Sequence, residues 1–193
     1  MVLSTGYNKI RTAIFISGTG SNLKSLIKFS KTNKSPISVD LIVSNNPKAK
    51  GLYYAKKYKI KKKVLNFKDK NSTENKLFSI LKVNNIKMIC LAGFMKILSK
   101  NFIKKFNGKI LNIHPSLLPK YKGLNTHERV LNNKEKYSGC TVHFVNSKLD
   151  SGKIILQKKV KITKNETNDS LAKKILVQEH KIYPKAILKI FNL

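Results

Sequence analysis

A strand-like segment of the chain ends in two side chains that can carry out chemistry. In "KILNIHPSLLPKYKG" (residues 109–123), an amide and an imidazole, Asn112 and His114, close an apolar run that prolines and a glycine then interrupt. Residues two apart on a strand project from the same face, so both are expected to meet one ligand. Asn112 can donate a hydrogen bond to an oxygen atom, and His114 can exchange a proton near neutral pH.

A carboxylate further along the chain completes a possible catalytic set. Asp150 lies in "NSKLDSGKIILQ" (residues 146–157), in a Ser/Gly-flanked loop directly before a predicted strand. Beside an imidazole, this carboxylate is expected to raise the pKa of His114 and to fix the ring, although a turn-forming Asp is the alternative. Since no Gly-x-Ser-x-Gly motif is present, the three groups predict acyl-type transfer, with a tetrahedral intermediate held by the amide of Asn112 and a protonated imidazole.

A glycine-rich turn near the N-terminus predicts a phosphate site. "SGTGSN" (residues 17–22) follows an apolar strand pattern, and Ser21 and Asn22 open a helical pattern whose free N–H groups suit an anion. The turn is not the dinucleotide fingerprint, because Leu23 stands where the third glycine belongs. A plain tight turn without a ligand is the alternative interpretation.

Strands and helices alternate along the chain and are expected to bring these groups together. The β–α order predicts an α/β fold, with a doubly wound, mostly parallel, Rossmann-like sheet and antiparallel strands near the C-terminal part. Ligands of such sheets bind at the carboxyl ends of the strands, where all three polar segments are expected. Strands are predicted at residues 12–17, 39–43, 63–67, 87–92, 109–113, 139–145 and 153–162, and helices at 23–29, 52–57, 74–85 and 168–191.

The length of 193 residues predicts a single domain over residues 1–193. No run of about 18 apolar residues predicts a membrane span, and the N-terminal segment lacks the pattern of an export signal, so we expect a cytoplasmic protein without a membrane partner. The two cysteines, Cys90 and Cys140, lie in apolar segments and are expected to be buried reduced thiols. No metal site is predicted, because the histidines and cysteines show no ligand spacing typical of one.

The formal net charge of +31 raises the question of a nucleic-acid partner. Of the 40 basic residues only Arg11 and Arg129 are arginine, whereas nucleic-acid readers use arginine forks and aromatic platforms. The densest run, "KKYKIKKKV" (residues 56–64), is interpreted as solvated surface. We therefore expect no specific nucleic acid, although the charge will steer small anions toward a pocket.

Six motifs follow one another along the chain from about Ile14 to Pro184, namely "ISGTGSNL", "LAGFMKILS", "LNIHPSLLPKYKG", "GCTVHFV", "LDSGKIILQ" and "QEHKIYP". In this order they resemble the phosphoribosylglycinamide formyltransferase family of the folate-dependent formyltransferase superfamily. The resemblance implies that a formyl group passes from 10-formyltetrahydrofolate to the amine of phosphoribosylglycinamide in purine (IMP) biosynthesis, without a metal or a covalent enzyme intermediate. It also implies small-molecule partners, and we expect a monomer or a weak homodimer.

The resemblance implies a role for individual residues. Asn112 is expected beside the formyl oxygen, His114 as general acid and Asp150 as the carboxylate that raises its pKa, and the Leu118–Pro119 bond is expected to be cis. The expected contacts of the ribonucleotide are Gly20, Ser21 and Asn22 with its phosphate, and Glu179 with its ribose or amine. The expected contacts of the folate are Lys70, Met95, Lys96, Ile97, Leu98, Asn112, Ser147, Lys148, Leu149, Asp150 and Ser151.

Two departures and three alternatives accompany this interpretation. Lys96 and Lys70 stand where the family usually carries arginine, so bidentate contacts to a phosphate or carboxylate are lost. A methionyl-tRNA formyltransferase-like activity would suit the basic charge, but it normally needs a C-terminal nucleic-acid-binding domain for which the sequence has no room. A formyltetrahydrofolate hydrolase-like activity would release formate to water. A non-enzymatic RNA-binding protein would leave the set of Asn112, His114 and Asp150 without a purpose.

Overall fold

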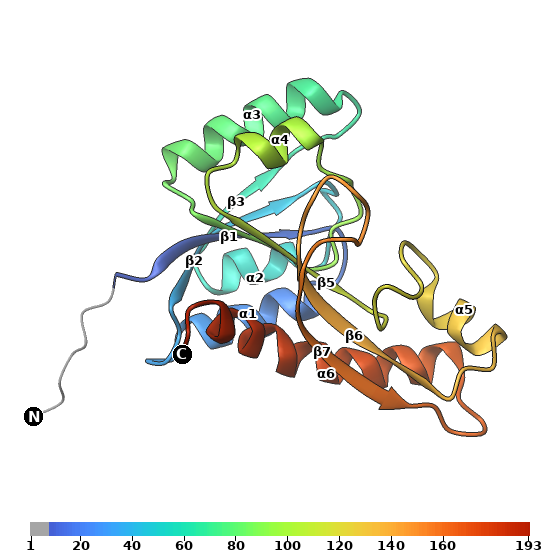
Figure 1. Ribbon diagram of the computed structural model, residues 1–193. Helices are drawn as coiled ribbons and strands as arrows, with labels where there is room; N and C mark the ends of the chain where they lie inside the picture. Colours follow the sequence, from blue (N-terminus) through green and yellow to red (C-terminus); the bar gives the residue numbers. More distant parts are fainter. Residues whose placement is uncertain (1–7) are drawn as a thin grey trace, which may run out of the picture.

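The computed structural model describes residues 8–193 and contains a mixed seven-stranded sheet between two layers of helices (Figure 1). The strand order is β3-β2-β1-β4-β5-β6-β7. The strands are β1 (Ile10–Ile16), β2 (Ile37–Ser44), β3 (Lys61–Val64), β4 (Met88–Leu91), β5 (Lys109–His114), β6 (Tyr137–Phe144) and β7 (Ile154–Lys161). The helices are α1 (Ser21–Ser30), α2 (Leu52–Lys57), α3 (Lys70–Val83), α4 (Lys100–Lys105), α5 (Thr126–Asn132) and α6 (Asn168–Ile190).

The central strands are buried on both faces, as their nearly continuous apolar sequences predict. In β1, Ile14 and Ile16 belong to a core that includes residues of α1 and α6, whereas Ala13 and Phe15 belong to a second core that includes residues of α3 and α4. Figure 1 shows these two helix pairs on opposite sides of the sheet. The predicted doubly wound α/β fold is confirmed.

The sheet changes from parallel to antiparallel pairing at β5. The strands from β3 to β5 pair in parallel, but β6 pairs antiparallel with β5, and β7 pairs antiparallel with β6, as predicted. Asn112 lies opposite His143, and His114 lies opposite Thr141. Side chains of directly opposed residues share a face, so this register places a second imidazole beside Asn112.

Three details differ from the predicted elements. The third strand occupies Lys61–Val64 instead of residues 63–67, because backbone pairing with Leu41–Ser44 of β2 defines this exposed edge strand, and its side chains are mostly lysine. The third helix begins at Lys70, where the Asp69 side chain accepts a hydrogen bond from Ser72 N, and not at residue 74. The short helices α4 and α5 were not predicted at all.

The Leu118–Pro119 peptide bond is cis, as predicted. Within residues 8–193, none of the helices is both long and apolar enough to cross a membrane. The predicted domain and the export prediction include residues 1–7, which lie outside the described residues.

Candidate active site

A large cavity lies at the carboxyl ends of β1, β4 and β5. Its volume is about 1190 Å³, large enough for two small-molecule ligands, and the turns after these strands line it together with residues of α5 and α6. The chain moves outward from β1 to β2 and β3 on one side, and from β4 to β5 on the other, so β1 and β4 form the topological switch point. This is the position at which doubly wound sheets bind ligands.

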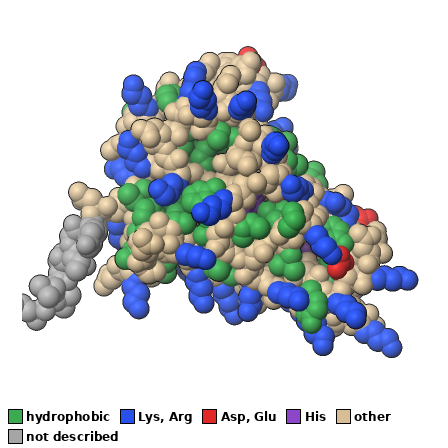
Figure 2. Space-filling view, in the orientation of Figure 1, with side chains coloured by type: hydrophobic (Ala, Val, Ile, Leu, Met, Phe, Trp, Pro, Cys, Tyr) green, Lys and Arg blue, Asp and Glu red, His purple; other side chains and the backbone are tan. Residues whose placement is uncertain are grey.

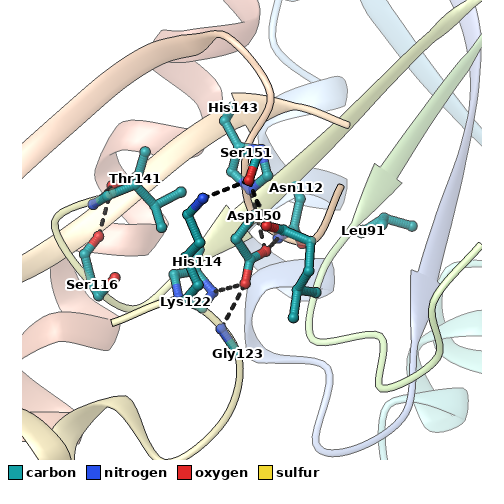
Figure 3. A network of polar contacts seen from close by, with 12 residues as sticks. Leu91, Asn112, His114, Ser116, Lys122, Gly123, Thr141, His143, Asp150 and Ser151 are labelled. Carbon is teal, nitrogen blue, oxygen red and sulfur yellow. Dashed lines mark hydrogen bonds and ion pairs between the residues drawn. The ribbon is translucent and has the colours of Figure 1, made fainter. Parts of the chain in front are cut away.

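The structure brings Asn112, His114 and Asp150 together inside this cavity (Figure 3). Asp150 Oδ2 lies 3.3 Å from His114 Nδ1, and Asn112 Nδ2 donates to Asp150 Oδ1 over 3.4 Å. The side chains of His114 and Asp150 are 7% and 8% exposed, so water screens their interaction only weakly. The three segments predicted to converge therefore do so.

Asp150 is held in place by the neighbouring loop. Its Oδ2 accepts a hydrogen bond of 2.9 Å from the Gly123 N–H, and its backbone adopts a left-handed conformation with φ of 43°. Burial acts to raise the pKa of Asp150, but the Gly123 N–H and the neighbouring imidazoles outweigh it and hold the pKa below its usual range. The carboxyl group is therefore ionised at neutral pH.

Both ring nitrogens of His114 have partners within the protein. Nε2 lies 2.8 Å from the Tyr121 carbonyl oxygen, and because a carbonyl can only accept, Nε2 carries the hydrogen there. Burial lowers the pKa of His114 below its ordinary value and outweighs the Tyr121 hydrogen bond and the charge of Asp150, which both raise it. Asp150 therefore raises this pKa, as predicted, while the net shift is downward because burial has the larger effect.

A second imidazole, His143, joins the cluster and was not predicted. Its Nδ1 donates to the Phe144 carbonyl oxygen over 2.8 Å, so in the neutral ring Nε2 accepts, and Asn112 Nδ2 donates to it over 3.2 Å. His143 Nε2 also lies 3.6 Å from Asp150 Oδ1. His143 thereby orients the amide of Asn112, with the N–H groups toward Asp150. The only sequence signal was a polar residue inside the apolar segment "TVHFV".

The predicted phosphate turn leads into α1 as expected. Gly20 is the N-cap residue with φ of 73°, and no side chain caps the helix, so its first N–H groups remain available for an anion. Gly51, which was not predicted, supports this turn from the start of α2. Its N–H donates to the Gly18 carbonyl, and a side chain there would lie 2.9 Å from Gly20 Cα.

The two remaining predicted ribonucleotide contacts bind each other in the free chain. Asn22 Nδ2 donates to Glu179 Oε2 over 2.7 Å, joining α1 to α6. Burial raises the pKa of Glu179 to about 7, although the Asn22 hydrogen bond opposes the shift. Among residues 8–193, two buried polar atoms without a partner, Asn22 Oδ1 and His127 Nδ1, belong to residues that line the cavity.

The opposite wall of the cavity is apolar and open. Met95 and Ile97 are 60% and 62% exposed, and Leu149 is 50% exposed, which is high for large apolar side chains. All but two of the predicted folate contacts line the cavity, namely Met95, Lys96, Ile97, Leu98, Asn112, Ser147, Lys148, Leu149 and Asp150. The two exceptions are Ser151, whose hydroxyl accepts from Lys122 Nζ over 2.5 Å, and Lys70 at the start of α3. A folate contact of Lys70 remains a prediction without support from the cavity lining.

The distribution of charge agrees with a solvated basic surface. Figure 2 shows the face of the molecule that Figure 1 also shows. Lysine and arginine side chains are spread over it from α3 to α6, and hydrophobic side chains lie in its middle. Within the part of the chain that the structure describes, no group of three or more histidine, cysteine, aspartate or glutamate residues is placed to hold a metal ion.

The fold and this cluster are typical of a group-transfer enzyme, because an amide, an imidazole and a carboxylate converge in the same cavity as a helix N-terminus that suits an anion. Residues 10–187 match the formyl transferase family. The chain belongs to this family.

Similar proteins include the phosphoribosylglycinamide formyltransferase of Escherichia coli (strain K12), which is 40% identical over 177 residues, or 90% of this chain and 84% of that protein. The Homo sapiens trifunctional purine biosynthetic protein adenosine-3 is 42% identical over 93% of this chain, which spans only 18% of that protein. The crystal structure of phosphoribosylglycinamide formyltransferase from Brucella melitensis has a TM-score of 0.89 at 40% identity, covering 95% of this chain and 96% of that one.

Proposed function

We propose that this protein transfers the formyl group of 10-formyltetrahydrofolate directly to the amine of phosphoribosylglycinamide in purine (IMP) biosynthesis. The observation that supports this proposal best is the cluster of Asn112, His114 and Asp150 in one cavity with the phosphate turn. The family membership supports the transferred group, and the relatives named phosphoribosylglycinamide formyltransferase support the acceptor.

The substrates are assigned to opposite walls of the cavity. The first N–H groups of α1 at Gly20, Ser21 and Asn22 bind the phosphate, and Glu179 accepts hydrogen bonds from the ribose or amine. The apolar wall from Met95 to Leu98, with Leu149 opposite, receives the folate ring system. The formyl carbon then lies near Asn112, where both walls meet.

In the transfer, the acceptor amine attacks the formyl carbon and forms a tetrahedral intermediate. The N–H of Asn112 that makes the long contact to Asp150 turns to the developing oxyanion, while His143 keeps the amide oriented. His114 Nε2 exchanges the Tyr121 carbonyl for the reacting nitrogens, and the neutral ring then carries its hydrogen on Nδ1, which donates a hydrogen bond to Asp150 Oδ2. His114 then takes the proton from the attacking amine and, as general acid, gives it to the folate nitrogen as the C–N bond breaks.

The test is a comparison of formyl acceptors. The purified protein is given 10-formyltetrahydrofolate with phosphoribosylglycinamide, with charged initiator tRNA, or with water alone, and formyl product or formate is measured. We expect transfer to phosphoribosylglycinamide, and a loss of about 10²- to 10⁴-fold in His114→Ala with folding intact. Preferred transfer to tRNA would indicate the methionyl-tRNA formyltransferase-like alternative, and formate release would indicate the hydrolase-like one. Near wild-type turnover of His114→Ala would refute the role of His114.

The remaining expectations concern partners and location. Small molecules are the proposed partners, the chain is proposed to act in the cytoplasm as a monomer or a weak homodimer, and no specific nucleic acid is proposed. DNA affinity measured at rising salt tests the last point. A steep loss toward physiological salt is expected for non-specific lysine contacts, and persistent affinity would contradict it.

A further inference from the structure

The cavity contains few cations for the substrates that it is proposed to bind. The chain carries 40 lysine and arginine residues, yet of the described residues only Lys96, Lys148 and Lys173 supply a cationic lysine or arginine side chain to the lining. A phosphate monoester carries close to two negative charges at neutral pH, and a helix N-terminus offers only about half a positive charge. The N–H groups of α1 alone therefore leave the phosphate incompletely neutralised.

The three lysines lie on different walls. Lys96 follows Met95 after β4, and Lys148 precedes Leu149 in the connection from β6 to β7, so both flank the apolar wall assigned to the folate. Lys173 lies on α6, the helix that α1 contacts through Asn22 and Glu179. It is therefore the lining lysine on the phosphate side of the cavity.

The register of α6 directs Lys173 along this wall. Lys173, Leu176 and Glu179 follow one another at three-residue steps and all line the cavity, so they form one ridge of the helix. Six residues separate Lys173 from Glu179, which corresponds to about 9 Å along the helix axis. An extended, exposed lysine side chain can cover most of that distance, and its ammonium group can meet a phosphate that lies between α6 and the start of α1.

We infer that Lys173 is the cation that binds the phosphate of the ribonucleotide substrate, together with the N–H groups at the start of α1. The inference rests on the proposed function and adds a residue that its sequence motifs do not contain. As a compact charge, the ammonium group contributes affinity without the bidentate geometry of an arginine. Lys173 binds substrate and does not touch the reacting atoms, so its removal affects acceptor affinity and not the chemical step.

The experiment separates the phosphate from the rest of the acceptor. In Lys173→Met we expect KM for phosphoribosylglycinamide to rise about 10- to 100-fold, the range for a lost charge-assisted hydrogen bond, while kcat and the KM for the folate donor stay within about twofold of wild type. Lys173→Arg should retain most of the affinity. Lys181→Met is the matched control, because Lys181 is exposed on the same helix but does not line the cavity.

The acceptor without its phosphate, ribosylglycinamide, provides the decisive comparison. Wild type and Lys173→Met should use it equally poorly, because the contact that Lys173 makes is then absent in both. An unchanged KM for the phosphorylated acceptor in Lys173→Met, or an equal rise for both acceptors, would overturn the inference while the proposed function stands. Failure of the wild-type protein to formylate either acceptor would refute the proposed function itself.

Discussion

Replacing Asp150 by asparagine removes one charge from the centre of the site while keeping the shape of the side chain. Asp150 Oδ2 lies 3.3 Å from His114 Nδ1, and both side chains are nearly buried. At this distance an imidazolium and a carboxylate attract each other by about 5 kcal/mol when the effective dielectric constant is about 20. The asparagine oxygen still accepts a neutral hydrogen bond, so only part of this energy is lost.

We therefore expect Asp150→Asn to lower kcat for formyl transfer by about 10²- to 10⁴-fold, because the imidazolium that His114 forms during proton transfer loses its counter-charge. The pKa of His114 should also fall further. Asp150 is one of the two groups that raise this pKa, and burial, His143 and Arg129 continue to lower it. The acidic limb of the kcat/KM profile, which reports neutral His114, should move to lower pH accordingly.

Single-turnover kinetics with saturating substrates, together with an NMR titration of the His114 ring, measure both effects in one variant. Asp40→Asn is the matched control. Asp40 lies on β2, its Oδ1 forms an ion pair with Arg11 Nη2 of β1 at 3.1 Å, and it does not line the cavity. Turnover of Asp150→Asn within tenfold of wild type would refute the electrostatic reasoning. So would a His114 pKa that stays constant or rises.

Three further substitutions test other parts of the site. Asn112→Ala should lower kcat by about 10²- to 10³-fold with little change in KM, as steady-state kinetics would show for a lost oxyanion donor, and a pure KM effect would contradict this role. Because burial raises the pKa of Glu179 from 4.5 to about 7, the folded chain binds more protons there than the unfolded chain, and stability falls as pH rises through this window. Urea unfolding should show that the free energy of unfolding of Glu179→Gln rises by about 3 kcal/mol relative to that of wild type as the pH is raised from 4.5 to about 7. A difference that does not change with pH would contradict the shift. Gly51→Ala places a methyl group 2.6 Å from Ile16 Cδ1 and should destabilise the fold by about 1–3 kcal/mol and raise KM for the ribonucleotide, whereas Gly18→Ala, with nothing within 4 Å, should not.

The sequence predicted the elements whose pattern follows directly from burial. Helix α1 repeats Leu23, Leu26 and Ile27 on its buried face, and the near-continuous apolar run of β4 matches a strand covered on both sides. Helices α4 and α5 were not predicted because each buries only one apolar residue, Phe102 in α4 and Val130 in α5, so neither shows an apolar face with helical spacing. The bounds predicted for strand β3 were shifted, because its lysine-rich sequence has no alternation of apolar and polar residues and only the pairing with β2 defines where it lies.

The site was predicted as far as its groups interrupt apolar segments at strand ends. Asn112 and His114 stand out in this way at the end of β5. Asp150 stands out instead as the acidic residue of the loop before β7, and it reaches the other two from the antiparallel β6–β7 connection. His143 does not stand out, because its role depends on lying opposite Asn112 in an antiparallel register that one sequence does not reveal. The direction of the His114 pKa depends on how deeply the folded chain buries the ring, which no spacing of residues specifies.

The two loops that hold His114 both contain a residue in an unfavourable backbone conformation. Tyr121, whose carbonyl accepts from Nε2, has φ of 56°, and Asp150, which faces Nδ1, has φ of 43°. Left-handed conformations of residues other than glycine cost of order 1–3 kcal/mol each, and they persist only where the surroundings hold them. Here the Gly123 N–H binds Asp150 and Lys122 binds Ser151, so each loop fixes the other. Because the His114 ring is held from both sides in this way, it is oriented before substrate binds. The unfavourable backbone conformations of Tyr121 and Asp150 are offset by these contacts, which position the site.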